Sequence, residues 1–323
     1  MKRFSNLALL AAACLLAGTA LAQQPYPNRP MRLVIPWPPG QATDLVGRVM
    51  AQKLTEILGY QVVADNRAGA GGMIGTDIVA KAAPDGYTIL AASSGPVTVA
   101  PLLQKTPYVS ARDLAPVAIA GFVGYVLVTT PSFPAKDIKE FITLAKNNPG
   151  KYTYASSGTG AAAHLAVEYF NSVAGIKAVH VPYKGSVPAL TDVISGQVNY
   201  MTETVTATMP HVRSGKLKAY GISTLKASSL APGVPTYATA ADMPGFDFAA
   251  WIGVMVSAGT PKPIVDKITA AVDKVLQTPD ARDKLGSVGL DVNYLRAEEM
   301  GRYLNKQSAQ VADIIKKANI KIE

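Results

Sequence analysis

Residues 31–64 read MRLVIPWPPGQATDLVGRVMAQKLTEILGYQVVA, and they contain a strand, a loop, a helix and a second strand. The apolar run at 32–35 predicts a buried strand, and the proline-rich segment at 36–41 predicts a loop. From Thr43 to Leu58 apolar residues recur at helical spacing, and Gly59 supplies a stop signal. Strand, helix and strand in this order predict an α/β protein.

The next segment repeats this order. A glycine-rich loop at 67–72 leads into a helix that we expect to end near Ala83, and Asp85-Gly86 turns the chain into a strand at 87–92. With right-handed crossovers, the resulting βαβαβ order predicts half of a doubly wound parallel sheet.

A second series of elements begins in the middle of the chain. Its predicted members are a helix at 136–147, a strand at 151–155, a loop at 156–160, a helix to Val173, a strand at 178–182, a helix at 187–196 and strands at 197–201 and 218–223. Extended apolar segments at 117–129 and 246–256 connect the two halves in both directions. We therefore predict two Rossmann-like lobes joined by two hinge strands around a ligand cleft. Lobe 1 is expected to comprise residues 23–123 and 246–323, and lobe 2 residues 124–245.

The N-terminus predicts export. Basic Lys2-Arg3, a short apolar core and a small-residue cleavage site near Ala22-Gln23 identify residues 1–22 as a secretory signal peptide. The mature chain is therefore expected in the periplasm. The single cysteine of the chain lies inside the signal peptide, so we expect neither a disulfide nor thiolate chemistry in the mature protein.

Charge and composition bear on the class of partner. The chain has 31 Lys and Arg against 22 Asp and Glu, a formal net charge of +9, but the basic residues are scattered and form no block. We therefore expect no nucleic acid partner and a mild preference for anions. Beyond the signal peptide, no stretch approaches the length of a membrane-spanning helix.

Signatures of catalysis and of cofactor binding are weak. The three histidines, His164, His180 and His211, have no metal-binding spacing, and no G-x-S-x-G motif occurs. Glycine patterns at 69–75 and 158–163 follow strands and open helices, as in dinucleotide-binding proteins. The first has the wrong spacing, and neither is followed by a suitably placed acidic residue. We expect no enzymatic activity, no cofactor and no metal.

Each predicted lobe offers a loop that leads into a helix N-terminus, at 40–44 and at 157–161. Free backbone N–H groups and the helix dipole favour an anion at such places. Two of them facing one cleft suit a dicarboxylate, whereas the alternative is that their small residues only form turns and caps. The candidate ligand-binding residues are Trp37, Pro39, Gly40, Gln41, Asp44, Ser93, Ser94, Ser157, Gly158, Thr159, Gly160, His164, Tyr183, Lys184 and Glu203.

Several candidates also have a purely structural interpretation. His164, about one turn into its helix, is either a packed histidine or a ligand contact. Lys184 either neutralises a carboxylate or is an ordinary exposed lysine. Glu203, expected just after the strand that ends at Met201, either accepts from a ligand donor or braces the hinge. Trp37 is either a core residue or, because it lies in the proline loop, a ligand contact.

The motifs taken together resemble the Bug family, the extracytoplasmic solute receptors of tripartite tricarboxylate transporters. The resemblance spans almost the whole mature chain. Its motifs are YP at 26–27, PWPPG at 36–40, ATD at 42–44, NR at 66–67, GAGG at 69–72, PDGYT at 84–88, HVPYKG at 180–185 and GQV at 196–198. It implies a type II periplasmic-binding-protein fold, a carboxylated ligand and two integral membrane partners (TctA/TctB-like subunits). Family ligands include citrate, other di- and tricarboxylates, acidic amino acids, nicotinate and terephthalate.

The resemblance also assigns roles to loops. In the family, the proline loop and the second-lobe serine/glycine loop hold ligand carboxylates, partly through water, and the matching positions here are 37–44 and 157–160. This chain has Gln41 where the family usually has a second glycine after Pro-Pro-Gly, and Glu203 where it often has Asp. We predict that Gln41 acts as a selectivity element; the alternative is that its side chain points to solvent.

The sequence therefore predicts a monomeric periplasmic solute-binding protein. It is expected to capture a small carboxylate, either a di- or tricarboxylate or an aromatic dicarboxylate, and to deliver it to a tripartite tricarboxylate-type transporter. We expect Ser157 and Thr159 to donate hydrogen bonds to one ligand carboxylate. One alternative is an exported carboxylate sensor for a membrane signalling system, and another is an enzyme built on the same two-lobed fold.

Overall fold

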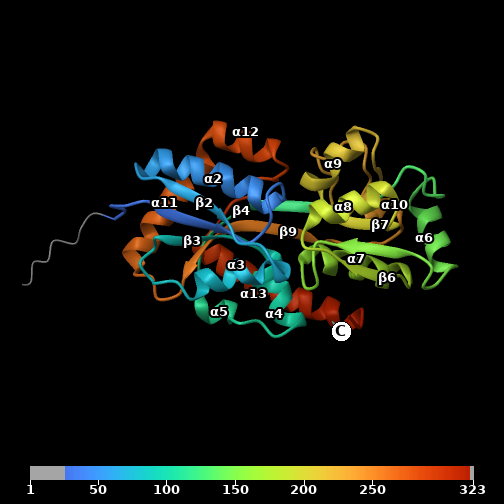
Figure 1. Ribbon diagram of the computed structural model, residues 1–323, viewed down its shortest axis with the longest axis horizontal. Helices are drawn as coiled ribbons and strands as arrows, with labels where there is room; N and C mark the ends of the chain where they lie inside the picture. The colour runs from blue at the N-terminus through green and yellow to red at the C-terminus, as the bar shows by residue number, and fades with distance from the viewer. Residues whose placement is uncertain (1–25, 321–323) are drawn as a thin grey trace, which may run out of the picture.

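In the computed structural model of the protein, residues 26–320 are described, and they form two lobes that lie side by side (Figure 1). The predicted signal peptide and its cysteine lie outside the described residues. None of the helices between residues 26 and 320 has the length and apolar character of a membrane-spanning segment.

The first lobe is built on a parallel sheet in which β1 (Met31–Ile35) lies between β2 (Val62–Asn66) and β3 (Thr88–Ser93). The chain passes from β1 to β2 on one side of it, and then crosses back over β1 to β3 on the other side. Right-handed connections of this kind place α2 (Ala42–Leu58) and α3 (Met73–Ala80) on opposite faces of the sheet (Figure 1). The predicted βαβαβ unit is confirmed.

One long strand passes through both lobes. The first part of β4 (Leu114–Thr129) pairs with the antiparallel β9 (Ala249–Ser257), which also pairs with β3. From Tyr125 onward, β4 pairs instead with β7 (Tyr200–Thr204) and β8 (Lys218–Ile222) of the second lobe. The predicted outgoing and returning connections are thus neighbouring strands of one continuous sheet.

The second lobe repeats the arrangement of the first. β5 (Thr153–Ser156) lies between the parallel strands β6 (Val179–Pro182) and β7, and α7 (Ala162–Ala174) and α8 (Ser186–Ser195) lie on opposite faces (Figure 1). The other helices of this lobe are α6 (Ile138–Lys146), α9 (Val205–Arg213) and α10 (Tyr237–Ala240). α6 was predicted from the sequence, whereas α9 and α10 were not.

The strand that was predicted at 197–201 begins later, at Tyr200. The backbone N–H of Val198 still bonds to the Asp192 carbonyl oxygen at 3.2 Å, so the residues after α8 belong to the turn that ends this helix. As a consequence, Glu203 lies inside the strand rather than after it.

The C-terminal helices pack mainly on the first lobe, as expected. α11 (Lys262–Gln277) and α12 (Pro279–Ser287) lie on the face of α2, and α13 (Ala297–Lys317) lies on the face of α3 (Figure 1). The short remaining elements are η1 (Ala70–Gly72), η2 (Gly95–Val99), α4 (Ala100–Leu103), α5 (Ser110–Asp113) and β10 (Leu295–Arg296).

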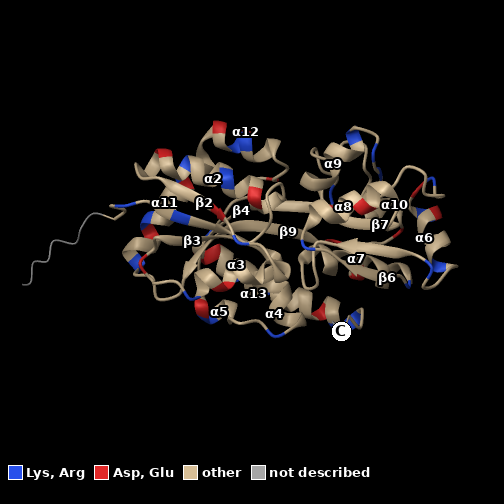
Figure 2. Ribbon diagram, in the orientation of Figure 1, with Lys and Arg blue, Asp and Glu red and all other residues tan. Residues whose placement is uncertain are grey.

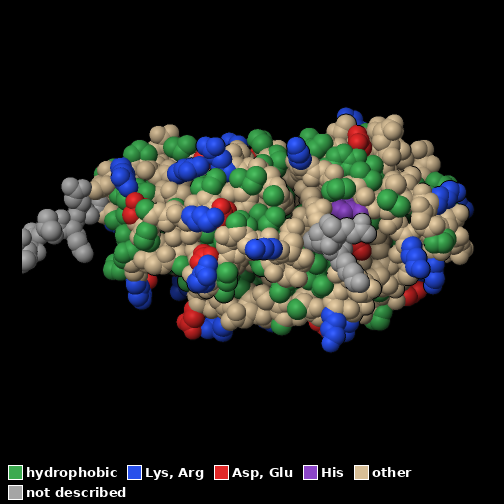
Figure 3. Space-filling view, turned by 60° about the horizontal axis from the view of Figure 1, so that its bottom comes forward, with side chains coloured by type: hydrophobic (Ala, Val, Ile, Leu, Met, Phe, Trp, Pro, Cys, Tyr) green, Lys and Arg blue, Asp and Glu red, His purple; other side chains and the backbone are tan. Residues whose placement is uncertain are grey.

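Apolar burial holds this architecture together. Trp251, Leu90 and Met300 belong to a buried cluster between the first-lobe sheet and the α3 and α13 face, while a larger cluster fills the opposite face and the second lobe. Lys and Arg are distributed over both lobes without forming a continuous basic face (Figure 2). On the face shown in Figure 3, apolar side chains are interrupted by polar and charged ones. Burial of apolar side chains therefore stabilises the fold. The space between the lobes is the candidate location of the functional site.

Candidate functional site

A cavity of about 40 Å³ lies between the lobes, against both hinge strands. Its lining comes from the first lobe (Trp37, Gln41, Ala42, Thr43, Ser93, Ser94, Gly95), the second lobe (Ser157, Ala161, Ala162, Ala163, Ser186, Glu203, Thr204) and the hinge strands (Tyr125, Ala250, Ile252). A space of this size holds about three water molecules. The two lobes are therefore closed on each other.

Glycine-containing loops of the two lobes meet at the seam between them: the loop at 69–72 contacts the loop at 157–161, and Gly185 contacts the proline loop. Gly71 has a backbone φ of +62°, and a Cβ at this position would lie 2.8 Å from the carbonyl oxygen of Thr159. Gly185 comes equally close from the other lobe, because a Cβ there would lie 2.8 Å from Cγ of Pro38. These close approaches require glycine, and they hold the two lobes against each other at the seam.

Two helices from opposite lobes begin at the cavity. α2 begins at Ala42 and α7 at Ala162, and neither helix has a side-chain cap on its first turn. The first residues of both helices line the cavity. Since the N–H groups of a first turn have no partner within the helix, those groups and the two helix dipoles favour an anion between them.

A hydrogen-bond network behind the cavity wall holds the proline loop in place. The Trp37 indole N–H donates to Ser93 Oγ at 2.9 Å, and the Asn66 side-chain amide donates to the Trp37 carbonyl oxygen at 2.9 Å. The buried Asp44 carboxylate accepts from the Gly40 N–H (2.9 Å), from Asn66 Nδ2 (2.7 Å) and from the Arg48 guanidinium (2.9 Å). Asp44 therefore positions the loop from behind, outside the cavity lining.

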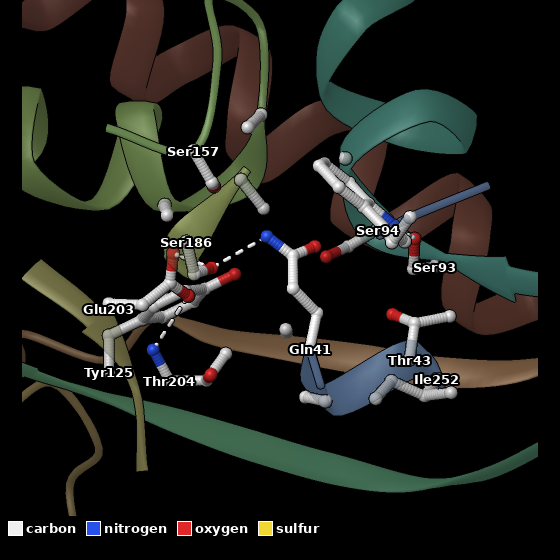
Figure 4. Close-up of a pocket in the computed structure, with 17 residues that line it drawn as sticks. Gln41, Thr43, Ser93, Ser94, Tyr125, Ser157, Ser186, Glu203, Thr204 and Ile252 are labelled. Carbon is white, nitrogen blue, oxygen red and sulfur yellow. Dashed lines mark hydrogen bonds between the residues drawn. The ribbon is translucent and has the colours of Figure 1, made fainter. Parts of the chain in front are cut away.

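A relay of hydrogen bonds crosses the cavity (Figure 4). Gln41, which is only 5% exposed, donates from Nε2 to Ser186 Oγ at 2.7 Å, and Ser186 Oγ donates to Glu203 Oε2 at 2.7 Å. The second carboxyl oxygen, Oε1, accepts from the Thr204 backbone N–H at 2.8 Å. Burial raises the pKa of Glu203, and these hydrogen bonds offset only part of that rise. The Gln41 side chain is directed into the cavity and not to solvent, so it links the two lobes directly.

The structure places the candidate residues in or around the cavity to different degrees. Those that line the cavity are Trp37, Gln41, Ser93, Ser94, Ser157 and Glu203. Gly158, Thr159 and Gly160 form the second-lobe side of the seam, and Pro39 and Gly40 are exposed at its rim.

The remaining candidates point elsewhere. Lys184 is exposed and outside the lining, and the Tyr183 hydroxyl donates to Asp192 at 2.5 Å. His164 lies behind the wall, where its ring stacks on that of His180 with centroids 4.3 Å apart. Among residues 26–320, no three His, Cys, Asp or Glu side chains are grouped closely enough to hold a metal ion.

Several residues that line the cavity were not among the candidates predicted from the sequence. Ser186 was visible as a polar residue between a strand and a helix, which is the same signal that singled out the other loops. Thr43 lies within the predicted ligand loop at 37–44, although it was not singled out there as a candidate. Tyr125 and Ile252 lie on the hinge strands, and nothing local in their sequence indicates that they face a cavity.

The chain is similar in sequence to known proteins. A family model described as the tripartite tricarboxylate transporter family receptor matches residues 46–320. The protein BugT of Bordetella pertussis is 35% identical over 300 residues, which cover 92% of each chain.

Solved structures share the fold. The periplasmic binding protein BugD superimposes with a TM-score of 0.84 at 34% identity, covering 92% of this chain and 100% of that chain. Rpa4515 of R. palustris, solved with adipate, gives a TM-score of 0.87 at 30% identity and covers 92% and 99%. MatC of Rhodopseudomonas palustris, solved with bound malate, gives 0.83 at 30% identity and covers 90% and 100%.

Proposed function

This chain belongs to the family of tripartite tricarboxylate transporter receptors, and we propose that it captures a small carboxylate and delivers it to a tripartite membrane transporter. Members of the family are periplasmic solute-binding receptors, not enzymes, and the two-lobed α/β fold of this chain matches theirs. For the ligand we propose the range that its family takes: di- and tricarboxylates or aromatic dicarboxylates. Rpa4515 with adipate and MatC with malate are structural neighbours within this range.

One observation carries the proposal. The uncapped N-termini of α2 and α7 come from different lobes and meet at a single cavity. A carboxylate between them receives backbone N–H groups from both sides without needing a basic side chain. Such a ligand stabilises the closed arrangement, because it bonds to both lobes at once.

The proposed lobes are residues 23–123 with 246–323 and residues 124–245. The change in strand pairing of β4 at Tyr125 supports a hinge at this place, since one strand enters both sheets there. We propose that the protein opens and closes about β4 and β9, and that Trp37 to Asp44 and Ser157 to Gly160 bring the ligand contacts together.

The function is tested by measuring thermal stability against a panel of di-, tri- and aromatic carboxylates. A ligand present at 100 times its Kd stabilises the folded protein by about 2.7 kcal/mol, which raises Tm by roughly 5 °C. Small-angle scattering should show compaction with the same ligand, and the ligand should be recovered unchanged. If no carboxylate in the panel raises Tm, the proposal is wrong.

Ser157 and Thr159 provide a matched pair of variants. Ser157 lines the cavity and Thr159 does not, so Ser157→Ala is expected to weaken carboxylate binding by about 10- to 100-fold, the effect of losing one hydrogen bond to a charged group. Thr159 was also predicted to donate to the carboxylate, but it does not line the cavity, so Thr159→Ala should bind within about twofold of wild type. Isothermal titration calorimetry with the tightest carboxylate of the panel measures both. Wild-type affinity in Ser157→Ala would remove this hydroxyl from the site.

Two integral membrane subunits of the TctA/TctB kind are the proposed recipients of the ligand, and the receptor is proposed to act in the periplasm as a monomer. Ligand-dependent capture of these subunits by the immobilised receptor distinguishes transport from the alternative role in sensing.

A further inference from the structure

The closed cavity is smaller than the ligands proposed for it. Its volume is about 40 Å³, which is room for about three water molecules. Adipate and malate, which are bound in two of the structural neighbours, each have many more non-hydrogen atoms than this space can hold. A ligand of this size can therefore bridge the lobes only where a group that now fills the space between them gives way.

The side chain of Gln41 lies in the middle of this space, and Figure 4 shows its amide between Ser186 and Ser94. Gln41 is the N-cap residue of α2, with an extended backbone (φ −78°, ψ 159°) and no side-chain cap hydrogen bond. A side chain at this position commonly accepts from the first turn of its own helix. The Gln41 amide instead crosses to the other lobe and donates to Ser186 Oγ at 2.7 Å, and the residue is 5% exposed.

The second lobe fits closely around this amide. A Cβ at Gly185 would lie 3.3 Å from Gln41 Nε2, so the absence of a side chain at Gly185 leaves room for the amide. The neighbouring Ser186 is buried, and its hydroxyl is held by Glu203 Oε2 at 2.7 Å. The acceptor that receives the Gln41 amide is therefore fixed in position by its own lobe.

Few polar contacts other than this one join the lobes. Between residues 26 and 320, no ion pair runs from one lobe to the other. The other hydrogen bonds between the lobes in this part of the chain lie at the hinge, where Ser223 and Leu225 bond to the residues just before β9. Across the cavity, the bond from Gln41 to Ser186 is thus the direct polar link between the lobes among the described residues.

We propose that the Gln41 carboxamide is an internal occupant of the ligand site, which holds the lobes closed without ligand and which an incoming carboxylate displaces from Ser186. The displacement step rests on the proposed function, because that function places the ligand in this cavity. One hydrogen bond between neutral groups changes the ratio of closed to open protein by about 3- to 10-fold. Since the ligand enters between open lobes, a smaller open population lowers its apparent affinity in proportion. Relatives with glycine at this position lack the competing amide.

The distance between two spin labels tests the closing role without any ligand. The single cysteine of the chain lies in the predicted signal peptide, so the mature protein accepts labels at Gln52→Cys in α2 and Thr191→Cys in α8, both exposed and in different lobes. In Gln41→Ala we expect the ratio of closed to open distances to fall by about 3- to 10-fold. Ser186→Ala, which removes the acceptor, should cause the same fall, and the double variant should cause no further fall.

Gln61→Ala is the matched control. Gln61 is an exposed glutamine of the first lobe, away from the cavity, so its replacement should leave the label distances unchanged. A ratio that is unchanged in either Gln41→Ala or Ser186→Ala overturns the inference and leaves the proposed function intact. If one of these two variants does not fold, the other decides.

Calorimetry with the tightest carboxylate of the panel tests the displacement. Gln41→Ala is expected to bind this ligand about 3- to 10-fold more tightly than wild type, because the ligand no longer competes with the amide. Equal or weaker binding overturns the displacement, since Gln41 is then a bystander or a ligand contact. If no carboxylate of the panel binds to wild type or to Gln41→Ala, the proposed function and the displacement are both wrong, and the label distances still decide whether Gln41 holds the lobes closed.

Discussion

Replacing Gly253 with alanine is expected to lower the free energy of unfolding by about 3 kcal/mol, at the upper end of the cost of overpacking. Gly253 lies in β9 at the centre of the sheet, paired with Ala92 on one side and Ile119 on the other. A Cβ at this position would lie 2.2 Å from the carbonyl oxygen of Ala118 and 2.9 Å from Cα of Ile119. Both are backbone atoms of β4, so relief requires moving one hinge strand away from the other. Chemical denaturation measures the loss.

Gly286→Ala is the control for this prediction. Gly286 lies inside α12, and a Cβ there would meet nothing within 4 Å. Alanine in a helix interior is favoured over glycine by about 0.5–1 kcal/mol, so this variant should be as stable as wild type or slightly more stable. If both variants unfold at the same denaturant concentration as wild type, the two hinge strands do not approach each other as closely as described.

The close approach between β9 and β4 at Gly253 could not be predicted from sequence patterns. The register between β4 and β9 shifts twice, near Pro116 and near Ile119, and each shift depends on how two strands more than a hundred residues apart pack together. Local periodicity predicted both strands, and the paired βαβ units on either side of them predicted a two-lobed protein. The side chains that the hinge presents to the cavity follow from the register, which is a tertiary property.

The site likewise combines features that the sequence predicts with features that it does not. Loops that join a strand to a helix N-terminus were recognisable from small residues, and Trp37, Gln41 and Ser157 do line the cavity. Glu203 was predicted to follow the strand but lies inside β7. The turn after α8 is longer than predicted, so the strand begins and ends later. Lys184 follows a strand like the others, but nothing in its sequence shows that its side chain stays in solvent. The position of a residue relative to a strand can thus be inferred from the local sequence, whereas the direction of its side chain relative to the cleft cannot.

Gln41 is the case where a departure from the family pattern proved informative. A glycine at this position would leave Ser186 and Glu203 without their partner from the first lobe. The glutamine instead closes a relay between the lobes through two hydrogen bonds of 2.7 Å.

Acidification is expected to destabilise the second lobe through His164. Burial, reinforced by the neighbouring His180, lowers the pKa of His164 to about 3, and burial lowers that of His180 to about 4. In the unfolded chain both histidines titrate near 6.5. Between pH 6.5 and about 3 the unfolded chain therefore binds protons that the folded chain does not, and the free energy of unfolding falls as the pH falls through this window. For His164 alone the loss at pH 4 amounts to about 3 kcal/mol.

His164→Phe isolates this contribution. Phenylalanine preserves the stack on His180 and removes Nδ1, which is buried without a hydrogen-bond partner. Glu168 nearby has a raised pKa and opposes the histidine effect, but it is present in both proteins and largely cancels in the comparison. The variant should therefore match wild type near pH 7 and exceed it by about 3 kcal/mol at pH 4 in urea unfolding. His211→Phe, at a half-buried site on α9, should change the pH profile much less.

The same histidines connect acid stability to ligand binding. The Ser156 hydroxyl oxygen accepts from the Gly158 N–H at 3.3 Å, and the same hydroxyl is hydrogen-bonded to His180 Nε2, 2.6 Å away. Charging His180 makes Nε2 the donor in this bond, which rearranges the hydrogen bonds of Ser156, the residue that precedes Ser157 in the cavity loop. Carboxylate affinity should therefore change as His180 takes up its proton near pH 4, and His164→Phe should leave the midpoint of this change in place, because His164 is still neutral at that pH. Carboxylate affinity that stays constant down to pH 4 would show that His180 and the ligand site are uncoupled.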